Sequence, residues 1–129
     1  MILVDTSIWI NIFNLKHFAP LDLNKISIWA TCPPVIQEVL QGINSDKAFN
    51  TIKEGLCALP CFNNPLSLDE YLLASDLYRL ARKKGKTVRS SVDCLIAAIA
   101  IINDIPVWHK DRDFDVLAEI SNLKIHKLH

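Results

Sequence analysis

The chain has 129 residues, of which half are hydrophobic and 22% are charged, and its 14 basic and 14 acidic residues leave a formal net charge of zero. This composition excludes a disordered chain, and the length suits one core, so we expect residues 1–129 to form a single domain. The charge balance excludes the overall positive field of a protein that coats nucleic acid, so any nucleic-acid binding must depend on a local patch.

The N-terminal sequence predicts a cytoplasmic protein. No basic segment precedes the first apolar residues, and Asp5 follows them almost at once, which is unlike a secretory leader. The most apolar stretch, residues 94–103, has about half the length that a membrane-spanning helix needs. In the cytoplasm we expect reduced, structural cysteines at all four positions, which are Cys32, Cys57, Cys61 and Cys94.

The first half of the chain alternates between predicted strands and helices. A short apolar run at residues 2–4 predicts a buried strand, and Asp-Thr-Ser after it is typical of a helix start. Ile8, Trp9, Ile12 and Phe13 have helical spacing, and we assign Trp9 to the core. A strand at 26–31 is followed by a helix that Pro33-Pro34 opens and Gly42 ends, and another helix runs from about Asp46 to Leu56.

The second half continues this alternation. A weak strand is expected near Cys61-Phe62, and Ser67 caps a helix that runs to about Lys84, before Gly85. That helix is apolar on more than one side, so one side is expected to meet a second subunit. Residues 91–103 form a nearly all-apolar helix, and the last elements are a strand at 106–108, a helix at 114–120 and a strand at 123–128. The order predicts an α/β sandwich with a mainly parallel central sheet of about five strands, flanked by helices.

Five acids are predicted to gather at one edge of this sheet. Asp5 ends the first strand, and Asp111 and Asp113 follow the strand at 106–108. Asp93 lies in the first turn of an otherwise apolar helix, where an unpartnered acid would cost several kcal/mol. Glu38 flanks the apolar face of its helix. Because active sites of such sheets gather at the carboxyl ends of the strands, these acids can converge on one pocket.

Several carboxylates in one pocket repel one another unless a cation neutralises them. Mg²⁺ or Mn²⁺ prefers oxygen ligands and keeps several waters, so a few carboxylates suffice. Such an ion supports phosphodiester hydrolysis. The acids therefore predict a metal-dependent phosphodiesterase.

Four segments resemble the four sequence blocks of VapC-type PIN-domain toxins, in the same order and from end to end of the chain. They are Val4-Asp5-Thr6-Ser7, Val35-Ile36-Gln37-Glu38-Val39-Leu40-Gln41-Gly42, Ser91-Val92-Asp93-Cys94-Leu95-Ile96-Ala97-Ala98 and His109-Lys110-Asp111-Arg112-Asp113-Phe114. The resemblance implies a PIN-domain-like sandwich and a metal-dependent endoribonuclease. It also implies a homodimer and inhibition by a VapB-like antitoxin that inserts into the active-site groove.

Carried over position by position, the resemblance implies that Asp5, Glu38, Asp93 and Asp111 form the acidic quartet and that Thr6 supplies a supporting hydroxyl. Family members differ in which acid of the Asp111-Arg112-Asp113 segment they use. Asp111 lies nearer the strand end and is our choice for the fourth acid. Asp113 either joins the metal site or caps the helix near Phe114, and Asp115 is expected on the surface.

Basic residues gather before the Asp93 helix, where six of them lie within eleven positions: Arg79, Arg82, Lys83, Lys84, Lys86 and Arg89. Such clustering favours phosphate binding, although a solvated helix end explains Lys83 and Lys84 equally well. Arg89 lies four residues before Asp93, which suits a phosphate near the metal. We therefore predict that Arg89 contacts an RNA substrate.

Two alternative functions remain open: a catalytically inert binding protein with the same fold, and a related nuclease that acts on DNA. The presence of all four acids opposes the first, and the short chain has no room for the DNA-gripping insertions of the second. A haloacid-dehalogenase-like phosphatase would need a second aspartate where Ser7 stands. A receiver module fits the pattern of acids no better.

Overall fold

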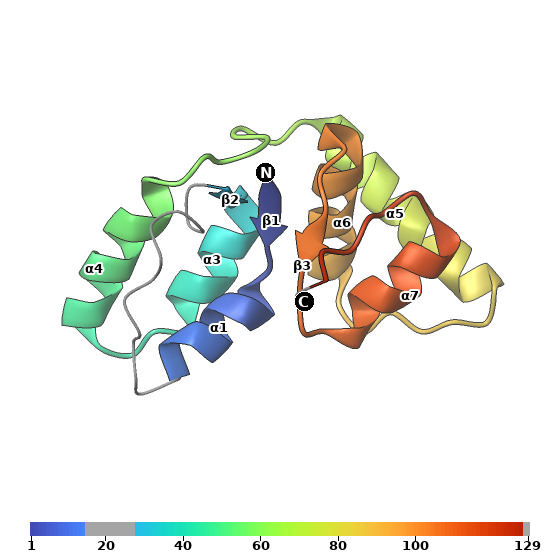
Figure 1. The fold of residues 1–129 in the computed structure, drawn as a ribbon. Helices are drawn as coiled ribbons and strands as arrows, with labels where there is room; N and C mark the ends of the chain where they lie inside the picture. The colour runs from blue at the N-terminus through green and yellow to red at the C-terminus, as the bar shows by residue number, and fades with distance from the viewer. Residues whose placement is uncertain (15–27, 128–129) are drawn as a thin grey trace.

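The structure is a computed structural model that describes residues 1–14 and 28–127. Its strands lie between two groups of helices (Figure 1). The elements in chain order are β1 (Ile2–Val4), α1 (Thr6–Asn14), β2 (Trp29–Ala30), α3 (Pro33–Gln41), α4 (Asp46–Cys57), α5 (Leu68–Lys83), α6 (Ser91–Asn103), β3 (Val107–Trp108) and α7 (Arg112–Ile120). The predicted α/β class and the predicted order of elements are confirmed.

The sheet is parallel throughout the described residues, and its order is β2-β1-β3. The central strand β1 places Leu3 opposite Ala30 on one side and Val107 on the other. All three residues are fully buried, because helices cover the sheet. The apolar run Ile2-Leu3-Val4 thus becomes the centre of the sheet, as expected for a strand with no polar residue.

Two further segments extend the sheet by single bridges instead of full strands. Thr31 bridges Cys61 beyond β2, and Val107 bridges Ile125 beyond β3, both in parallel. The backbone hydrogen bonds of these bridges, from N–H to carbonyl oxygen, have N–O distances of 2.8–2.9 Å. These are the positions where strands were predicted near residues 61–62 and 123–128. The described residues therefore form three of the roughly five predicted parallel strands, and the two predicted edge strands are reduced to single bridges.

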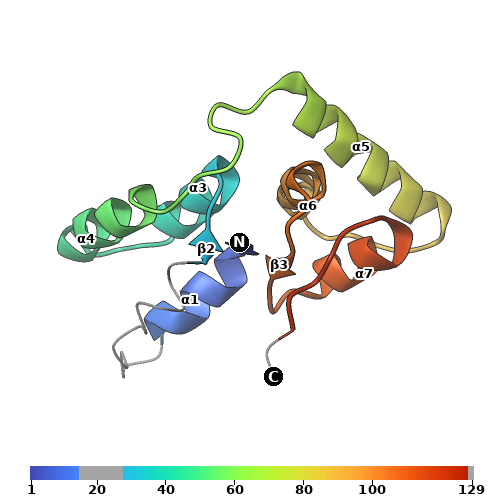
Figure 2. The ribbon, with the colours of Figure 1, turned by 45° about the horizontal axis from the view of Figure 1, so that its top comes forward.

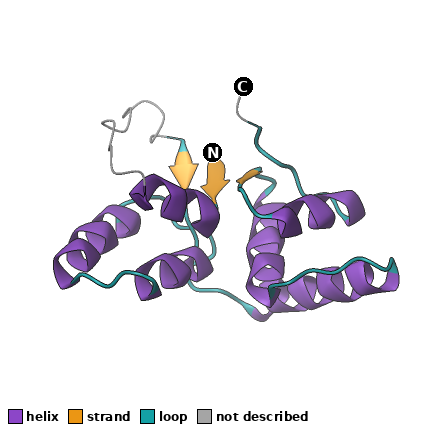
Figure 3. Cartoon of the chain, turned by 90° about the horizontal axis from the view of Figure 1, so that it is seen from below, coloured by secondary structure: helices purple, strands orange, loops and turns teal. Residues whose placement is uncertain are grey.

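The helices lie on either side of the strands. In two views, α1, α3 and α4 lie on one side and α5, α6 and α7 on the other (Figures 1 and 2). A view from below shows the strands in the space between these groups (Figure 3). Helix α6 is the most buried, with seven residues from Asp93 to Ala100 inside the protein. It is the central helix that its apolar sequence predicts.

Helix boundaries follow local signals in the sequence. Helix α3 begins at Pro33 and is followed by Gly42, as predicted. Ser67 precedes α5, where its N–H and hydroxyl donate to the Glu70 carboxylate at 2.7 and 2.6 Å. Helix α6 spans the predicted residues, while α7 begins at Arg112, two residues before the predicted start. The predicted strand at 26–31 is described only from residue 28 onward, and Trp29–Ala30 is its paired part.

The structure also shows where Trp9 and the four cysteines lie. Trp9 is buried, and its ring meets that of Trp29 edge-on at 5.5 Å, so its assignment to the core is confirmed. All four cysteines are free, with Cys32 and Cys94 buried. Among the described residues, no helix is both long and apolar enough to span a membrane.

Candidate metal centre

Asp5 is held at the carboxyl end of β1 by both its backbone and its side chain. Its N–H donates to the Trp108 carbonyl of β3 at 3.0 Å. Its Oδ2 accepts from the Ser7 N–H at 3.0 Å and from the Ser7 hydroxyl at 2.6 Å. The other oxygen, Oδ1, is buried and has no hydrogen-bond partner among the described residues. Oδ2 of Asp5 is thus held in place by hydrogen bonds, while Oδ1 remains available to bind a ligand.

Glu38 reaches the same region from α3, near Asp5. Thr6, the first residue of α1, donates from Oγ1 to Glu38 Oε1 at 2.9 Å. Thr6 is buried and Glu38 is partly buried, so water competes little for this contact. The hydroxyl expected to support the acids therefore contacts Glu38.

Asp93 lies in the first turn of α6, where it is only 5% exposed. Its Oδ2 is buried without a hydrogen-bond partner among the described residues. The helix N-terminus contributes a favourable potential for a negative charge, but it does not replace a partner for that oxygen.

Asp111 and Asp113 have distinct roles at the start of α7. Asp111 is the N-cap residue, and its Oδ1 accepts from the Asp113 N–H at 2.9 Å. The Asp113 carboxylate is 1% exposed and accepts from the Arg89 and Ser90 amides at 3.0–3.1 Å. The alternative in which Asp113 caps this helix is therefore wrong, because the helix begins at Arg112 and Asp111 takes that place.

The structure brings the five acids together in two overlapping triads. One ligand oxygen each from Asp5, Glu38 and Asp93 lie within 4.8 Å of one another, and the same holds for Asp93, Asp111 and Asp113. Asp93 belongs to both triads. The acids reach this place from both groups of helices, since α1 and α3 lie on one side of the strands and α6 and α7 on the other (Figure 2).

Burial and, to a smaller extent, repulsion between carboxylates oppose ionisation of Asp5, Glu38 and Asp93. Burial is the main reason why the pKa of Asp93 rises to about 9, and the charges of Asp111 and Asp5 raise it further. Burial also raises the pKa of Asp5, against the lowering effect of its hydrogen bonds from Ser7. It raises the pKa of Glu38 as well, against the hydrogen bond from Thr6. Without a cation, the site therefore favours the protonated forms of Asp93, Asp5 and Glu38 more than water does.

The donor set fits a hard divalent cation. It consists of carboxylates alone, and two of their buried oxygens, Asp5 Oδ1 and Asp93 Oδ2, have no partner within the part of the chain that the structure describes. A cation would satisfy both oxygens and offset the burial and repulsion that raise the pKa values of Asp5, Glu38 and Asp93. Mg²⁺ and Mn²⁺ prefer such oxygen ligands.

The basic residues before α6 form no common ion-pair network with the acids. Arg89 is exposed, and its backbone amide, which binds Asp113, places the residue beside the triads. Lys86 pairs instead with Glu119 on α7. Arg89 is therefore the member of the basic cluster whose position beside the acids is established by a direct contact.

Two polar residues at the site were not singled out by the sequence pattern. The Ser7 hydroxyl, besides binding Asp5, accepts from the Lys110 N–H at 3.0 Å. His109 Nδ1 accepts from the Asp111 N–H at 3.1 Å. Both residues adjoin the predicted acids in sequence, and this proximity was the available signal. The contact of Ser7 with Lys110, however, depends on how β1 and β3 are placed side by side, whereas that of His109 with Asp111 is local.

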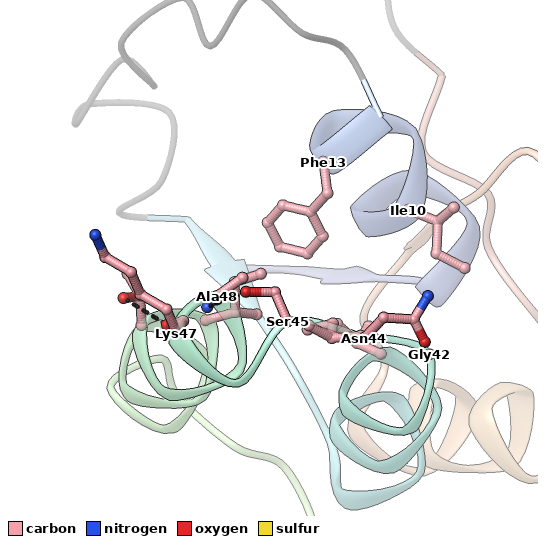
Figure 4. A pocket seen from close by; sticks show the side chains of 11 residues that line it. Ile10, Phe13, Gly42, Asn44, Ser45, Lys47 and Ala48 are labelled. Carbon is pink, nitrogen blue, oxygen red and sulfur yellow. Dashed lines mark hydrogen bonds between the residues drawn. The ribbon is translucent and has the colours of Figure 1, made fainter.

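An apolar groove lies apart from the acids, between α1 and the α3–α4 connection. Ile10 of α1 faces it from one side, and Asn44, Ser45 and Lys47 lie on the other (Figure 4). None of the five acids lines this groove. The candidate metal centre is therefore a separate feature of the surface.

Comparisons with known proteins agree with this arrangement. Residues 2–120 match the family model described as "PIN domain". The chain is 38% identical to Ribonuclease VapC11 of Mycobacterium tuberculosis, over 96% of each chain. It is similar in structure to VapBC2 from Rickettsia felis bound to a promoter DNA fragment, with a TM-score of 0.76, 18% identity and coverage of 100% of both chains. It is also similar to VapBC-5 of M. tuberculosis, a member of the VapBC family of toxin–antitoxin systems, with a TM-score of 0.69, 21% identity and coverage of 98% and 97%.

Proposed function

Since this chain belongs to the PIN-domain family, we propose that it hydrolyses RNA at a divalent cation held by Asp5, Glu38, Asp93 and Asp111. Its similarity to a VapC ribonuclease extends over almost the whole of both chains. The chain is accordingly an endoribonuclease of the VapC type and the toxin of a toxin–antitoxin module. Residues 1–129 form a single PIN domain in this proposal, and the RNA substrate agrees with the cytoplasmic location expected from the sequence.

The observation that carries the proposal is the pair of buried, unpartnered carboxylate oxygens on Asp5 and Asp93. Buried polar atoms without partners are rare in proteins, because their desolvation is not compensated. These two belong to residues of one triad, whose ligand oxygens lie within 4.8 Å of one another. Burial of these two oxygens without partners destabilises the metal-free protein. A bound cation would supply the missing partner for both.

Asp111 is the better fourth ligand because of how the neighbouring hydrogen bonds are distributed. The helix cap uses only Oδ1 of Asp111. Both oxygens of Asp113, in contrast, accept from backbone amides at Arg89 and Ser90. We therefore assign Asp113 to holding the start of α6, which carries Asp93, and Asp111 to the cation.

Mg²⁺ or Mn²⁺ bound here supplies the Lewis acidity and charge neutralisation that phosphodiester hydrolysis needs. The chain's own residues provide the orientation. Ser7 fixes one oxygen of Asp5, and Thr6 fixes one oxygen of Glu38. Such support limits the motion of the carboxylates, and small misplacement at a reacting phosphate costs rate steeply.

Arg89 is the proposed contact for an RNA phosphate. Its guanidinium is solvent-accessible and has no ion-pair partner among residues 1–14 and 28–127. Its backbone is bound to Asp113 beside the acids. A cation placed in this way suits binding of the substrate backbone, which is the main electrostatic contribution to nucleic-acid affinity.

An antitoxin and a second copy of the chain are the proposed protein partners. A basic antitoxin side chain among the carboxylates would form charge-assisted hydrogen bonds and occupy the place of the cation. The dimer is supported by α5, which exposes four large apolar side chains: Leu68 (69%), Tyr71 (50%), Leu72 (54%) and Tyr78 (41%). A self-complementary apolar face of this kind is typical of a two-fold interface.

A cleavage assay tests the proposed activity against both alternatives. The purified protein is incubated with Mn²⁺ and end-labelled single strands of RNA and DNA of one sequence. We expect internal cleavage of the RNA alone, and its loss in Asp5→Asn. Binding of RNA without cleavage would support an inert binding protein, and equal cleavage of DNA would support a DNA nuclease.

A further inference from the structure

His109 is unusually well enclosed for a polar residue in the segment that joins β3 to α7. Its side chain is only 5% exposed, although Lys110 beside it is exposed. The imidazole ring lies 5.1 Å, centroid to centroid, from the ring of Phe114, which is fully buried. The ring therefore has a fixed place against the first turn of α7.

Both ring nitrogens have partners. Nδ1 accepts a hydrogen bond from the Asp111 N–H at 3.1 Å, so the ring proton must be on Nε2. Nε2 lies 3.3 Å from Oδ1 of Asp115, whose negative charge favours that tautomer. A carboxylate and an imidazole arranged in this way determine the orientation of the ring.

The contact with Asp111 belongs to a longer chain of hydrogen bonds. His109 accepts a hydrogen bond from the Asp111 N–H, and Oδ1 of Asp111 accepts one from the Asp113 N–H. Asp113 in turn accepts from the amides of Arg89 and Ser90, immediately before α6. The imidazole thus supports one end of a network that sets Asp111 and Asp93 relative to each other.

We propose that His109 is a positioning residue for the metal centre, because its Nδ1 holds the backbone of Asp111 and thereby orients that carboxylate toward the other acids. The inference rests on the proposed function, since it concerns the same site. It assigns no direct contact with substrate or metal to His109. Groups that orient metal ligands in this way typically change metal affinity or activity 10- to 100-fold when removed.

Two substitutions distinguish the effect of the Nδ1 hydrogen-bond acceptor of His109 from the effect of packing its ring against Phe114. His109→Phe keeps an aromatic ring against Phe114 but has no acceptor for the Asp111 amide. His109→Asn keeps an acceptor oxygen close to the place of Nδ1 but loses the ring. We expect His109→Phe to weaken Mn²⁺ binding by about 10-fold and His109→Asn by less than about 3-fold.

Two measurements do not depend on catalysis. Free Mn²⁺ is quantified by electron paramagnetic resonance during titration of each protein, and hydrogen exchange of the Asp111 amide is followed in chelator. His109→Phe should accelerate that exchange, and His109→Asn should preserve its protection. RNA cleavage is then measured at saturating Mn²⁺, where we expect a lower kcat for His109→Phe with little change in KM.

A surface variant keeps the test informative if either ring substitution unfolds the protein. The Asp115 side chain is 64% exposed, so Asp115→Asn leaves the core intact while removing the charge that faces Nε2. We expect a loss of Mn²⁺ affinity of about 2- to 5-fold, smaller than that of His109→Phe. Asp104→Asn is the matched control, because Asp104 is exposed, pairs with Lys124 beyond the end of α6 and tolerates asparagine at its left-handed φ of 52°.

Each outcome decides the proposal. Wild-type Mn²⁺ affinity and kcat in a folded His109→Phe would overturn it, and so would a lowered melting temperature as the sole effect. Equal effects of Asp115→Asn and Asp104→Asn would also overturn it. A wild-type protein that neither binds Mn²⁺ nor cleaves RNA would overturn the proposed function and this inference together. That outcome is distinguishable because the wild type itself fails.

Discussion

Thr6 and Glu38 are joined by a hydrogen bond of 2.9 Å from Oγ1 to Oε1, although 32 residues separate them in the chain. The contact connects the first residue of α1 to the middle of α3. It also lowers the pKa of Glu38 in opposition to burial, which raises it. The hydroxyl therefore favours the ionised carboxylate that a cation needs.

Replacement of this hydroxyl tests that effect. Thr6→Val keeps the shape of the side chain but removes the donor, so the pKa of Glu38 should rise. Because the carboxylate then forms at higher pH, the acidic limb of the activity profile should move to higher pH. Activity near neutrality should fall by about 10-fold. Thr6→Ser is the matched control and should retain most of the activity; an unchanged profile for Thr6→Val would contradict the role given to Thr6.

Asp93 predicts an unusual pH dependence of stability for the metal-free protein. Burial raises the pKa of Asp93 from its ordinary value of 3.8 to about 9 in the folded state, so the folded state binds an extra proton between these values. Stability from this group is fully present below the lower pKa, falls as pH rises, and is lost above about pH 9. In chelator, the melting temperature should therefore decrease from pH 5 to pH 9.

The amide variant should reverse this behaviour. Asp93→Asn removes the titrating group, so the melting temperature in chelator should depend less on pH and should be higher than that of the wild type at pH 8. An increase of about 1–3 kcal/mol in the free energy of unfolding is expected, because the wild type must take up a proton at Asp93 to fold at pH 8, whereas the neutral amide need not. RNA cleavage should be lost in the same variant. An Asp93→Asn protein that is less stable than the wild type at pH 8, with a melting temperature that depends more steeply on pH, would contradict this prediction.

Metal binding should stabilise the wild type in proportion to occupancy. A ligand at 100 times its dissociation constant adds about 2.7 kcal/mol to the folded state. We expect Mn²⁺ to raise the melting temperature of the wild type and to have little effect on Asp5→Asn. Differential scanning fluorimetry with a Mn²⁺ series provides the measurement. Ser75→Ala on α5, where the hydroxyl donates to the Tyr71 carbonyl of its own helix away from the acids, is a control that should respond as the wild type does.

Growth of cells separates a toxin from an inert scaffold. Expression of the wild type without a partner should arrest growth, and Glu38→Gln or Asp111→Asn should relieve the arrest. The reason is that each acid would help to hold the cation that phosphodiester hydrolysis needs, and small misplacement at a reacting phosphate costs rate steeply. Colony counts and protein levels are compared for the three strains. Equal toxicity at matched protein levels would exclude the chemistry proposed for these acids.

Assembly is tested by sedimentation at micromolar concentration. The apolar face of α5 predicts a mass near twice the 14.6 kDa of one chain. Leu72→Glu, at a position that is 54% exposed, should shift the mass toward the monomer without unfolding the protein. Glu54→Gln on α4 serves as a surface control. A monomeric wild type would remove the interface assigned to α5.

Sequence was most informative where local signals agree with burial. Helix α6 was predicted to its ends because Ser90-Ser91 is typical of a helix start, apolar residues fill the helix after Asp93, and the apolar run stops at the polar Asn103. The start of α7 was missed by two residues, since Asp111 and Asp113 are equally plausible caps until the amides of Arg89 and Ser90 are seen to occupy Asp113.

The lengths of the sheet edges and the polar contacts of the site could not be predicted in the same way. The segments at Cys61 and Ile125 have strand-like composition, but the extent of their pairing depends on neighbours far away in sequence. The convergence of the acids was predicted because strand ends share one edge of a sheet. The roles of Ser7 and His109 depend on side-chain directions, which no periodicity encodes.

The position of β1 between β2 and β3 has a consequence for how the chain is made. Strand β1 is synthesised before both of its neighbours and acquires the second one only when Val107–Trp108 has been added, and Asp111 and Asp113 emerge later still. A nascent chain that ends before residue 107 carries Asp5, Glu38 and Asp93 but lacks the partner strand that fixes Asp5 through the Trp108 carbonyl. The ribosome that produces this toxin is therefore not exposed to a finished active site until translation has passed the last of its acids.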